Sequence, residues 1–504
     1  MFDFKKNNNL YISFYIIFSV LFIAYQSSIK NINLKGTLLL FGLLIIIASF
    51  LILYLYDKDL PIYKLAFILI LTFGVLCVFL SPIVSISDES EHFVRSEMTS
   101  RGVIEPVYVN NTNHLLRGYE TIASVHGAAI HKLGGKTVFE TTWDDKKINY
   151  KKSFVGSSFA QNPFYGYIPQ AIGIDIAKAL NLNNIWMLWL GRLCNLLMYA
   201  FIASYAIKKA PHYKKALFLT ACFPLAISQA GSLSIDATVN SLALLTIAYF
   251  LYIYFKDDST VGLLDVSVFL ILDLLCGLTK VTYLGLILLI FLVPKSRFNL
   301  KKSFYYSRIG PIFIFIIGLL WSHFAEKKLA LSWRASYALR HGVNPTIQLL
   351  YISKHLGQFL TTLFDFNNLK ILYLGLFYFG HGNFCSFSSL FLVITFFVFY
   401  WIFTLNYSDK QLFNKKTRIG IFLISCIIYY GTLFVQYLTW CPIGATKIYE
   451  IEFGRYFIPL VALGPMIFNL NKDKILYKFS DKLFYTLIIS FMGILVLLTF
   501  ITFY

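Results

Sequence analysis

Charge is scarce in this sequence. Only 14% of its 504 residues are charged, whereas 58% are hydrophobic and the mean hydropathy is +0.67. A soluble protein of this length needs far more polar surface, so that class is excluded. The charge that is present is mostly positive, with 44 Lys and Arg against 25 Asp and Glu. In a membrane protein such cations lie in short cytoplasmic loops and contact anionic lipid, so no nucleic-acid partner is expected.

The sequence also lacks the common motifs of metal and nucleotide sites. Of its seven cysteines, five lie in apolar runs and only Cys385 and Cys441 fall near predicted loops. None shows metal-ligand spacing, so we expect free thiols rather than disulfides or a zinc site. There is no GxxxxGK[ST] phosphate loop and no GxGxxG after a strand. Any activated group must therefore reach the protein through the membrane or from outside.

Long apolar runs fill most of the chain. Because a membrane-spanning helix needs about 20 apolar residues, the sequence predicts an all-α polytopic membrane protein with about 13 spans, in a range of about 11 to 14. The predicted spans are 10–27, 36–56, 64–84, 186–207, 216–233, 237–255, 262–278, 281–294, 309–326, 387–405, 419–438, 456–470 and 483–503. The pair from 262 to 294 is the weakest, since Gly277 and Lys280 interrupt it.

Basic clusters predict the orientation of these spans. With a cytoplasmic N-terminus, every dense cluster of Lys and Arg falls on the cytoplasmic side, as the positive-inside rule demands. Two large loops, 85–185 and 327–386, then face outward and are expected to contain short interfacial helices. We divide the chain into an N-terminal helix pair at 1–60, a transmembrane core over 61–470 and a C-terminal helix in 471–504.

The first outward loop opens with several reactive side chains. In order they are Ser87, Asp88, Glu89, Glu91, His92 and Arg95. Ser87 is a good N-cap, after which Asp88, His92 and Arg95 share a helix face, and Glu91 is spaced to pair with Arg95. Acids in a first turn complement the helix dipole without any catalytic role. A carboxylate held there also stays ionised and can accept a proton or ligate a divalent cation, so both interpretations stay open.

Further ionisable residues lie near the outer ends of predicted spans, where charge is costly and usually functional. They are Arg192, Asp236, Lys280 and Arg455. Singly, Asp236 can cap a helix and each cation can extend to the interface. As a set, three cations beside acids favour an anionic lipid headgroup, such as a phosphate or pyrophosphate. No metal site is predicted, although Asp88 is a candidate ligand for a divalent Mg or Mn ion and could pair with His92 on one helix face.

Five stretches at these residues resemble, in the same order, a family of predicted bacterial membrane proteins called domain of unknown function 2142. The stretches are 88–95, 162–170 with 191–195, 232–236, 280–283 and 454–459. The family is in turn similar to the GT-C class of polytopic glycosyltransferases. Those enzymes use a lipid-phosphate-linked sugar and an acidic residue in an early extracytoplasmic loop. That loop usually follows the first span but here follows the third, so the helix pair at 10–56 resembles an N-terminal addition.

The resemblance implies roles for particular residues. Asp88 would be the catalytic carboxylate, with Glu89 and His92 also assigned to catalysis. The residues assigned to substrate or lipid-phosphate binding are Arg95, Arg192, Asp236, Lys280, Tyr283, Arg455 and Tyr456. The implied partners are a polyprenyl-phosphate sugar donor, a cell-surface glycan acceptor and membrane lipids. The implied activity is an inverting glycosyl transfer on the extracytoplasmic face of a bacterial cell membrane.

Other functions remain open at this point. A polysaccharide polymerase or ligase would use a longer lipid-linked glycan on the same side of the membrane. A flippase or transporter of lipid-linked glycans would line a path with its charges, and a structural scaffold would need no site. Transporters place ionisable residues near the middle of the membrane and often show inverted repeats. The sequence shows no repeat, and the charges considered above lie at the outer boundary.

Overall fold

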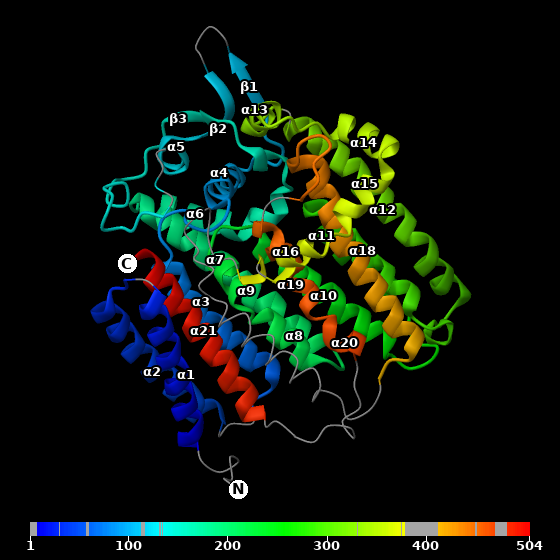
Figure 1. Cartoon of the computed structure of the whole chain (residues 1–504), viewed down its shortest axis with the longest axis horizontal. Coiled ribbons are helices and arrows are strands. Elements are labelled where there is room, and N and C mark those ends of the chain that lie inside the picture. The colour runs from blue at the N-terminus through cyan, green and yellow to red at the C-terminus, as the bar shows by residue number, and fades with distance from the viewer. Residues whose placement is uncertain are drawn as a thin grey trace.

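A computed structural model describes residues 8–29, 31–56, 60–111, 116–130, 133, 135–329, 331–373, 375–377, 412–448, 451–468 and 481–504. Most of these residues are helical. Long helices form a bundle, and short helices with one small sheet cover one end of it (Figure 1). We call this end the sheet end. The described N-terminal helix starts at the opposite end.

Eight helices in the described residues are long and apolar enough to cross a membrane. They are α1 (Asn8–Ile29), α2 (Leu34–Tyr56), α3 (Ile62–Leu80), α7 (Asn184–Lys209), α10 (Asp236–Tyr254), α12 (Lys301–Leu329), α18 (Lys415–Trp440) and α21 (Asp481–Phe503). Each coincides with one of the predicted spans. The prediction of a polytopic helical membrane protein is therefore supported, and its count of about 13 spans exceeds the eight that meet this criterion.

The predicted span 216–233 forms two short helices in series. They are α8 (Lys214–Ala221) and α9 (Pro224–Ala230). The break follows from Pro224, because the residue before a proline is pushed out of the helical region, and Phe223 has extended backbone. Apolar length alone did not reveal this interruption.

Other predicted spans are also short or interrupted. The range 262–294 contains α11 (Leu263–Thr279) and the 3-10 helix η4 (Val281–Leu292), and η5 (Lys295–Arg297) follows. Lys280 separates α11 from η4 with extended backbone. The range 456–470 contains the end of η9 (Ile451–Phe457), then α19 (Ile458–Val461) and α20 (Gly464–Phe468). The predicted span 387–405 lies outside the described residues.

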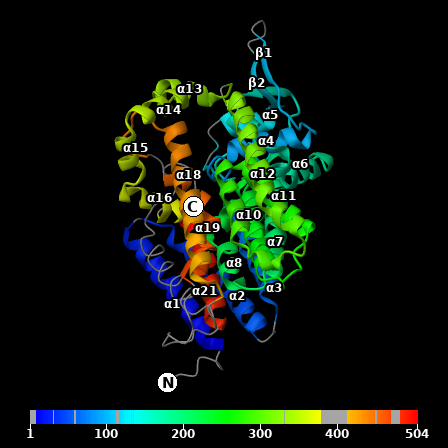
Figure 2. The same ribbon diagram turned by 90° about the vertical axis from the view of Figure 1, so that its right-hand side faces the viewer.

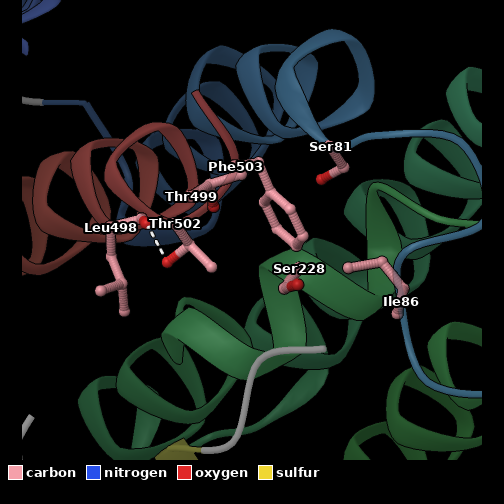
Figure 3. Close-up of a pocket in the computed structure, with 7 residues that line it drawn as sticks. All are labelled: Ser81, Ile86, Ser228, Leu498, Thr499, Thr502 and Phe503. Atoms are coloured by element: carbon pink, nitrogen blue, oxygen red, sulfur yellow. Dashed lines mark hydrogen bonds between the residues drawn. The ribbon is translucent and has the colours of Figure 1, made fainter. Parts of the chain in front are cut away.

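The two ends of the chain meet in one group of helices. The C-terminal helix α21 packs against α1, α2 and α3 (Figure 1). Near its last turns, a cavity of about 10 Å³ is lined by residues of α21 together with Ser81, Ile86 and Ser228 (Figure 3). The Thr502 hydroxyl beside it already donates to the Leu498 carbonyl at 2.7 Å. This cavity can hold no more than about one water molecule, which excludes it as a substrate site.

The first large loop forms most of the sheet end. Its elements are α4 (Glu89–Ser100), β1 (Tyr108–Asn111), β2 (Leu116–Ile122), α5 (Ala123–Ile130), β3 (Lys152–Val155), η2 (Ser158–Gln161), η3 (Phe164–Tyr167) and α6 (Ile168–Ala179). The strands pair antiparallel in the order β1-β2-β3, with Tyr119 opposite Val155. Phe93, Val94 and Trp143 belong to a separate apolar core here. The expectation of short helices is confirmed, but the all-α prediction missed this small sheet.

The second large loop adds a series of short helices. They are α13 (Trp333–Arg340), α14 (Pro345–Lys354), α15 (Leu356–Leu363), η6 (Phe366–Asn368), α16 (Leu369–Tyr373) and η7 (Gly375–Phe377). Figure 2 shows α13 and α14 at the sheet end, on the side away from α6. The short helices predicted for this loop are therefore present.

Candidate functional site

Asp88 stands at the entrance to α4. Its backbone lies in the left-handed region, with φ 61° and ψ 10°, where Asp and Asn are the commonest residues other than glycine. It occupies the N-cap position that the sequence predicted for Ser87, and its side chain makes no capping hydrogen bond. Its carboxylate instead forms an ion pair with Arg455 and is 28% exposed.

Arg455 connects two carboxylates that are far apart in the sequence. It lies in η9, is only 6% exposed, and its Nη2 donates to Asp88. Its Nε lies 3.1 Å from Oδ2 of Asp236 without forming a hydrogen bond. Its Nη1 is buried and has no hydrogen-bond partner among the described residues. The guanidinium is therefore held by ion pairs from two sides, while Nε and Nη1 make no hydrogen bond among the described residues.

Lys280 and Tyr456 complete this group. The Lys280 Nζ lies 2.8 Å from Oδ1 of Asp236 and 3.1 Å from the centre of the Tyr456 ring. The Tyr456 hydroxyl lies 3.2 Å from Arg455 Nη2, and the Tyr283 hydroxyl donates to the Tyr456 carbonyl at 2.6 Å. We call Asp88, Asp236, Lys280, Arg455 and Tyr456 the Arg455 cluster. Tyr283, also predicted for the site, contacts this cluster through the Tyr456 backbone carbonyl.

Arg192 and Glu89, also predicted for the site, form a different and closed pair. Arg192 Nε and Nη2 donate to the two Glu89 oxygens at 2.8 and 2.7 Å, and both side chains are fully buried. The other three Arg192 donors bind carbonyls at 2.7 to 3.0 Å, those of Val78, Ser81 and Pro82. Glu89 also accepts a hydrogen bond from the Leu233 amide. Since all five Arg192 donors are used, none remains for a phosphate.

Arg95 is occupied in a similar way. Its fully buried guanidinium donates to three backbone carbonyls and one hydroxyl, those of Asn162, Val103, Ile104 and Thr99. The predicted pair between Glu91 and Arg95 does not form, and that prediction was wrong. Glu91 accepts hydrogen bonds from the Ser157 hydroxyl and the Ser158 amide instead, each at 2.8 Å. Burial raises the pKa of Glu91, partly offset by these hydrogen bonds.

His92 lies buried beside the Arg455 cluster. Its Nδ1 is 2.9 Å from the Tyr167 hydroxyl, and its Nε2 is 3.3 Å from the Ser234 hydroxyl. Its ring packs against Phe159, with ring centres 4.5 Å apart. Burial lowers the pKa of His92 to about 3, so the imidazole is neutral near pH 7. A neutral imidazole donates from one nitrogen and accepts at the other, which matches its two hydroxyl partners.

A known protein family matches most of the chain. The family described as "Predicted membrane protein (DUF2142)" matches residues 71–463. The chain belongs to this family. The matched range contains the whole Arg455 cluster and leaves out α1, α2 and α21. No curated protein and no solved structure matches the chain.

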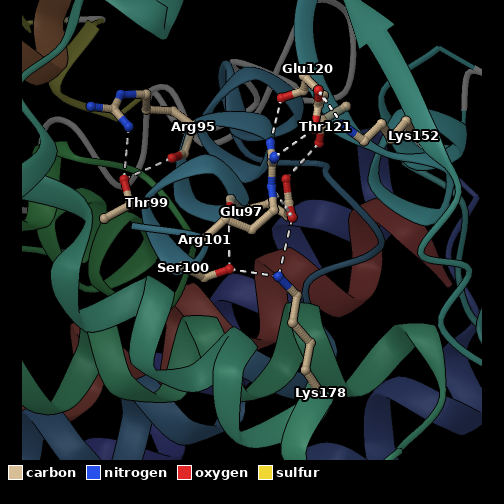
Figure 4. Close-up of polar contacts among 9 residues, drawn as sticks. All are labelled: Arg95, Glu97, Thr99, Ser100, Arg101, Glu120, Thr121, Lys152 and Lys178. Atoms are coloured by element: carbon tan, nitrogen blue, oxygen red, sulfur yellow. Dashed lines mark hydrogen bonds and ion pairs between the residues drawn. The ribbon is translucent and has the colours of Figure 1, made fainter. Parts of the chain in front are cut away.

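A second charge network within the family range lies at the other end of α4 (Figure 4). Glu97 is fully buried and accepts from Arg101 at 2.9 Å, from Lys178 at 3.1 Å and from the Thr121 hydroxyl at 2.9 Å. Arg101 also pairs with Glu120 at 3.0 Å. These contacts connect α4, α6 and the sheet, so this network supports the fold. The sequence interpretation had assigned no role to it.

Asp88, the possible ligand for a divalent cation, is paired with Arg455. Among the described residues, no group of three or more His, Cys, Asp or Glu side chains could hold a metal ion. The carboxylates of Asp88 and Asp236 already face Arg455 and Lys280. The cluster therefore holds two cations and two carboxylates in mutual contact.

Asp273 is an ionisable residue that the sequence interpretation missed. It lies in α11, is fully buried, and neither carboxylate oxygen has a hydrogen-bond partner among the described residues. The signal was visible, because an acid within the apolar run 263–279 is costly and usually functional.

Proposed function

We propose that the protein is a membrane glycosyltransferase that transfers a sugar from a polyprenyl-phosphate-linked donor to a cell-surface glycan. The observation that carries this proposal is the buried Nη1 of Arg455, which lacks an acceptor among the described residues. An unsatisfied buried donor costs about 1–3 kcal/mol unless a ligand completes it. Phosphate oxygens suit a guanidinium particularly well, because two parallel hydrogen bonds can form.

The distribution of cations supports an extracytoplasmic site. Lys208 and Lys209 end α7 and Lys415 and Lys416 begin α18, at the end of the bundle opposite the sheet end (Figure 1). Since cytoplasmic loops carry the excess of Lys and Arg, the sheet end faces outward in this proposal and the N-terminus faces the cytoplasm. The Arg455 cluster is then reached by a donor whose lipid stays in the membrane of a bacterial cell.

The proposal also includes a GT-C-like core over 61–470. Here the serial pairs α8 with α9 and α11 with η4 cross the membrane as interrupted spans, which raises the number of crossings above eight. Interrupted helices are tolerated at membrane depth when protein covers them. The α8 and α9 residues are almost entirely buried, as this requires.

The proposed reaction uses the cluster as one unit. Asp88 takes the proton of an acceptor hydroxyl, and that oxygen forms a bond to the anomeric carbon of the donor sugar. The bond from this carbon to the phosphate oxygen breaks, and its electron pair leaves with the polyprenyl phosphate. Arg455 and Lys280 stabilise the leaving phosphate. Asp88 is the most exposed carboxylate of the cluster, so it is assigned as the base, and one base suffices for inversion.

The glycans of a deletion strain test this proposal. We expect that loss of the gene removes one sugar from a surface glycan and that the wild-type gene restores it. Arg455→Gln should fail to restore it, whereas Arg340→Gln should succeed. Arg340 is a matched control, because it is exposed on α13 at the same end and its Nε donates to the Ser336 carbonyl within its own helix at 3.2 Å. Identical glycans in the deletion strain and its parent would refute the transferase.

A flippase for lipid-linked glycans is the second candidate, and Asp273 is the observation that favours it. A buried, unpaired carboxyl within an apolar helix is typical of proton-coupled transporters. Asp273→Asn keeps the shape of the side chain but removes its titration. If the protein is a flippase, cells with this variant should lose the surface glycan. If it is a transferase, cells that contain as much of this variant as of the wild-type protein should have wild-type glycans.

A further inference from the structure

The Arg455 cluster balances its own charge. Two carboxylates, Asp88 and Asp236, face two cations, Arg455 and Lys280, within a few ångströms. An anionic ligand that enters this group adds negative charge without adding a cation. It must therefore either repel the resident carboxylates or take the place of one of them.

The two carboxylates are held very differently. Asp236 is 4% exposed and contacts both cations, Lys280 through Oδ1 at 2.8 Å and Arg455 through Oδ2 at 3.1 Å. Asp88 is 28% exposed, and the cation it pairs with is Arg455. Displacing Asp88 moves a partly hydrated group toward water, whereas displacing Asp236 would strand a buried charge. An incoming anion therefore exchanges with Asp88.

The nitrogens of Arg455 fit this exchange. Nη1 is buried without an acceptor among the described residues, and Nη2 is the atom that holds Asp88. Nη2 also donates to the Tyr456 hydroxyl at 3.2 Å, so both of its hydrogens are used. A phosphate group that binds Nη1 and Nη2 together must replace one of these two acceptors, and its negative charge repels the Asp88 carboxylate rather than the neutral hydroxyl. Nε stays directed to Asp236, which keeps the guanidinium in place.

We propose that the donor phosphate and the Asp88 carboxylate compete for Arg455, so that binding of the donor releases Asp88 to act as the base. This inference rests on the proposed function for the identity of the anion. It explains why a carboxylate that must accept a proton is paired with an arginine, which would otherwise weaken it as a base. The base becomes active only when the phosphate is seated.

The same exchange accounts for product release. After transfer, Asp88 carries the proton that left the acceptor hydroxyl, and a neutral carboxyl group does not compete for a guanidinium. The polyprenyl phosphate product therefore stays on Arg455 at first. Once Asp88 loses this proton to water, its charge returns and the carboxylate again competes with the phosphate for Arg455. A variant without this charge should hold phosphate more tightly while it fails to react.

Binding of a short-chain prenyl phosphate to the purified full-length protein tests the competition. Asp88→Asn keeps the left-handed backbone accessible and removes the charge. We expect it to bind the prenyl phosphate about tenfold more tightly than the wild type, since a competing charge-assisted hydrogen bond is gone. Asp88→Gly, which also accepts a positive φ, should show the same gain if the asparagine variant folds poorly.

Glu105→Gln is the matched control for net charge. Glu105 belongs to the same loop, is 61% exposed and pairs with Lys328 rather than Arg455. The Glu105→Gln variant should bind prenyl phosphate as tightly as the wild type, whereas Arg455→Gln should lose binding. If Asp88→Asn gains affinity for prenyl phosphate but not for inorganic phosphate, the ligand is a lipid phosphate. If it gains affinity equally for both, the site recognises the phosphate group itself. Unchanged or weaker binding in both Asp88 variants would overturn the competition.

The outcome separates this inference from the proposed function. Tighter binding in Asp88→Asn with normal glycans in the deletion strain would keep the exchange and reject the transferase. Altered glycans in the deletion strain with unchanged affinity in Asp88→Asn would keep the transferase and reject the exchange.

Discussion

Asp88 and Glu89 are neighbours in the chain, and each pairs with an arginine from a distant segment. The Glu89–Arg192 pair is fully buried, and all five Arg192 donors have acceptors. The Asp88–Arg455 pair is partly exposed on the carboxylate side, and Arg455 Nη1 has no acceptor among the described residues. The first arrangement is complete in itself, while the second has a donor left over for a ligand.

This difference assigns separate roles to residues that look equivalent in the sequence. A saturated buried arginine ties together backbone carbonyls from the end of α3 and the entry to the loop. A buried arginine with an N–H donor that has no acceptor lowers the stability of the fold, and a bound anion removes this cost. Counting the acceptors of each arginine therefore distinguishes the two where burial does not, since both arginines are buried.

The largest effect on stability is expected for Arg192→Met. Removing this guanidinium leaves Glu89 as a buried, uncompensated charge and frees three carbonyls, which should cost about 3–5 kcal/mol. Thermal unfolding of the detergent-purified protein measures this loss. The double variant with Glu89→Leu should recover part of the stability, because no unpaired charge remains. A single variant as stable as the wild type would show that the closed pair does not hold the fold.

A medium effect, dependent on pH, is expected at His92. Burial lowers the pKa of His92 from its ordinary value of 6.5 to about 3 in the folded protein. Between these values the unfolded chain binds a proton that the folded protein does not, so the folded state loses stability as the pH falls below 6.5. At pH 5 the loss should be roughly 2 kcal/mol.

The pH dependence can be isolated with His92→Gln. This variant should remove the contribution of His92, so that its melting temperature falls less than that of the wild type between pH 7 and pH 5. Other titrating groups act in both proteins and cancel in the difference. Equal slopes in the two proteins would mean that His92 is not a buried neutral imidazole.

The smallest effect is expected for Glu120→Gln. Glu120 pairs with Arg101 and Lys152 at the edge of the Glu97 network, but all three side chains are partly or largely exposed (Figure 4). Exposed ion pairs contribute about 0–1 kcal/mol because water and salt screen them. The free energy of unfolding should fall by less than about 1 kcal/mol. A loss as large as that in Arg192→Met would remove the distinction between closed, buried pairs and exposed ones.

Part of this arrangement could be predicted from the sequence. Uninterrupted apolar runs such as α2 and α21 were placed well, because length and hydropathy determine a span directly. The break at Lys280 was also placed, because a charged residue interrupts the apolar run there. The break at Phe223 was missed, since it lies inside an apolar run and depends on local backbone conformation before Pro224. The strands β1 to β3 were missed because short strands depend on pairing with distant segments rather than on intrinsic preference.

The candidate site shows the same limit. The motifs drew attention to Asp88, Asp236, Lys280 and Arg455, which the structure brings together. They also drew attention to Arg192, because a motif shows that a charge is present without showing how many acceptors surround it. Those acceptors are largely backbone carbonyls, and carbonyls have no signature in a sequence.

The most direct test of the whole account is the surface glycan of cells that carry only Asp88→Asn. The variant keeps the backbone preference of Asp88 and leaves the Glu89–Arg192 pair intact, so its folded amount in the membrane should match the wild type. We predict that glycan modification per folded protein falls by about a hundredfold or more, as expected when a general base is lost. Wild-type glycan modification in this strain would contradict the assignment of Asp88 as the catalytic base.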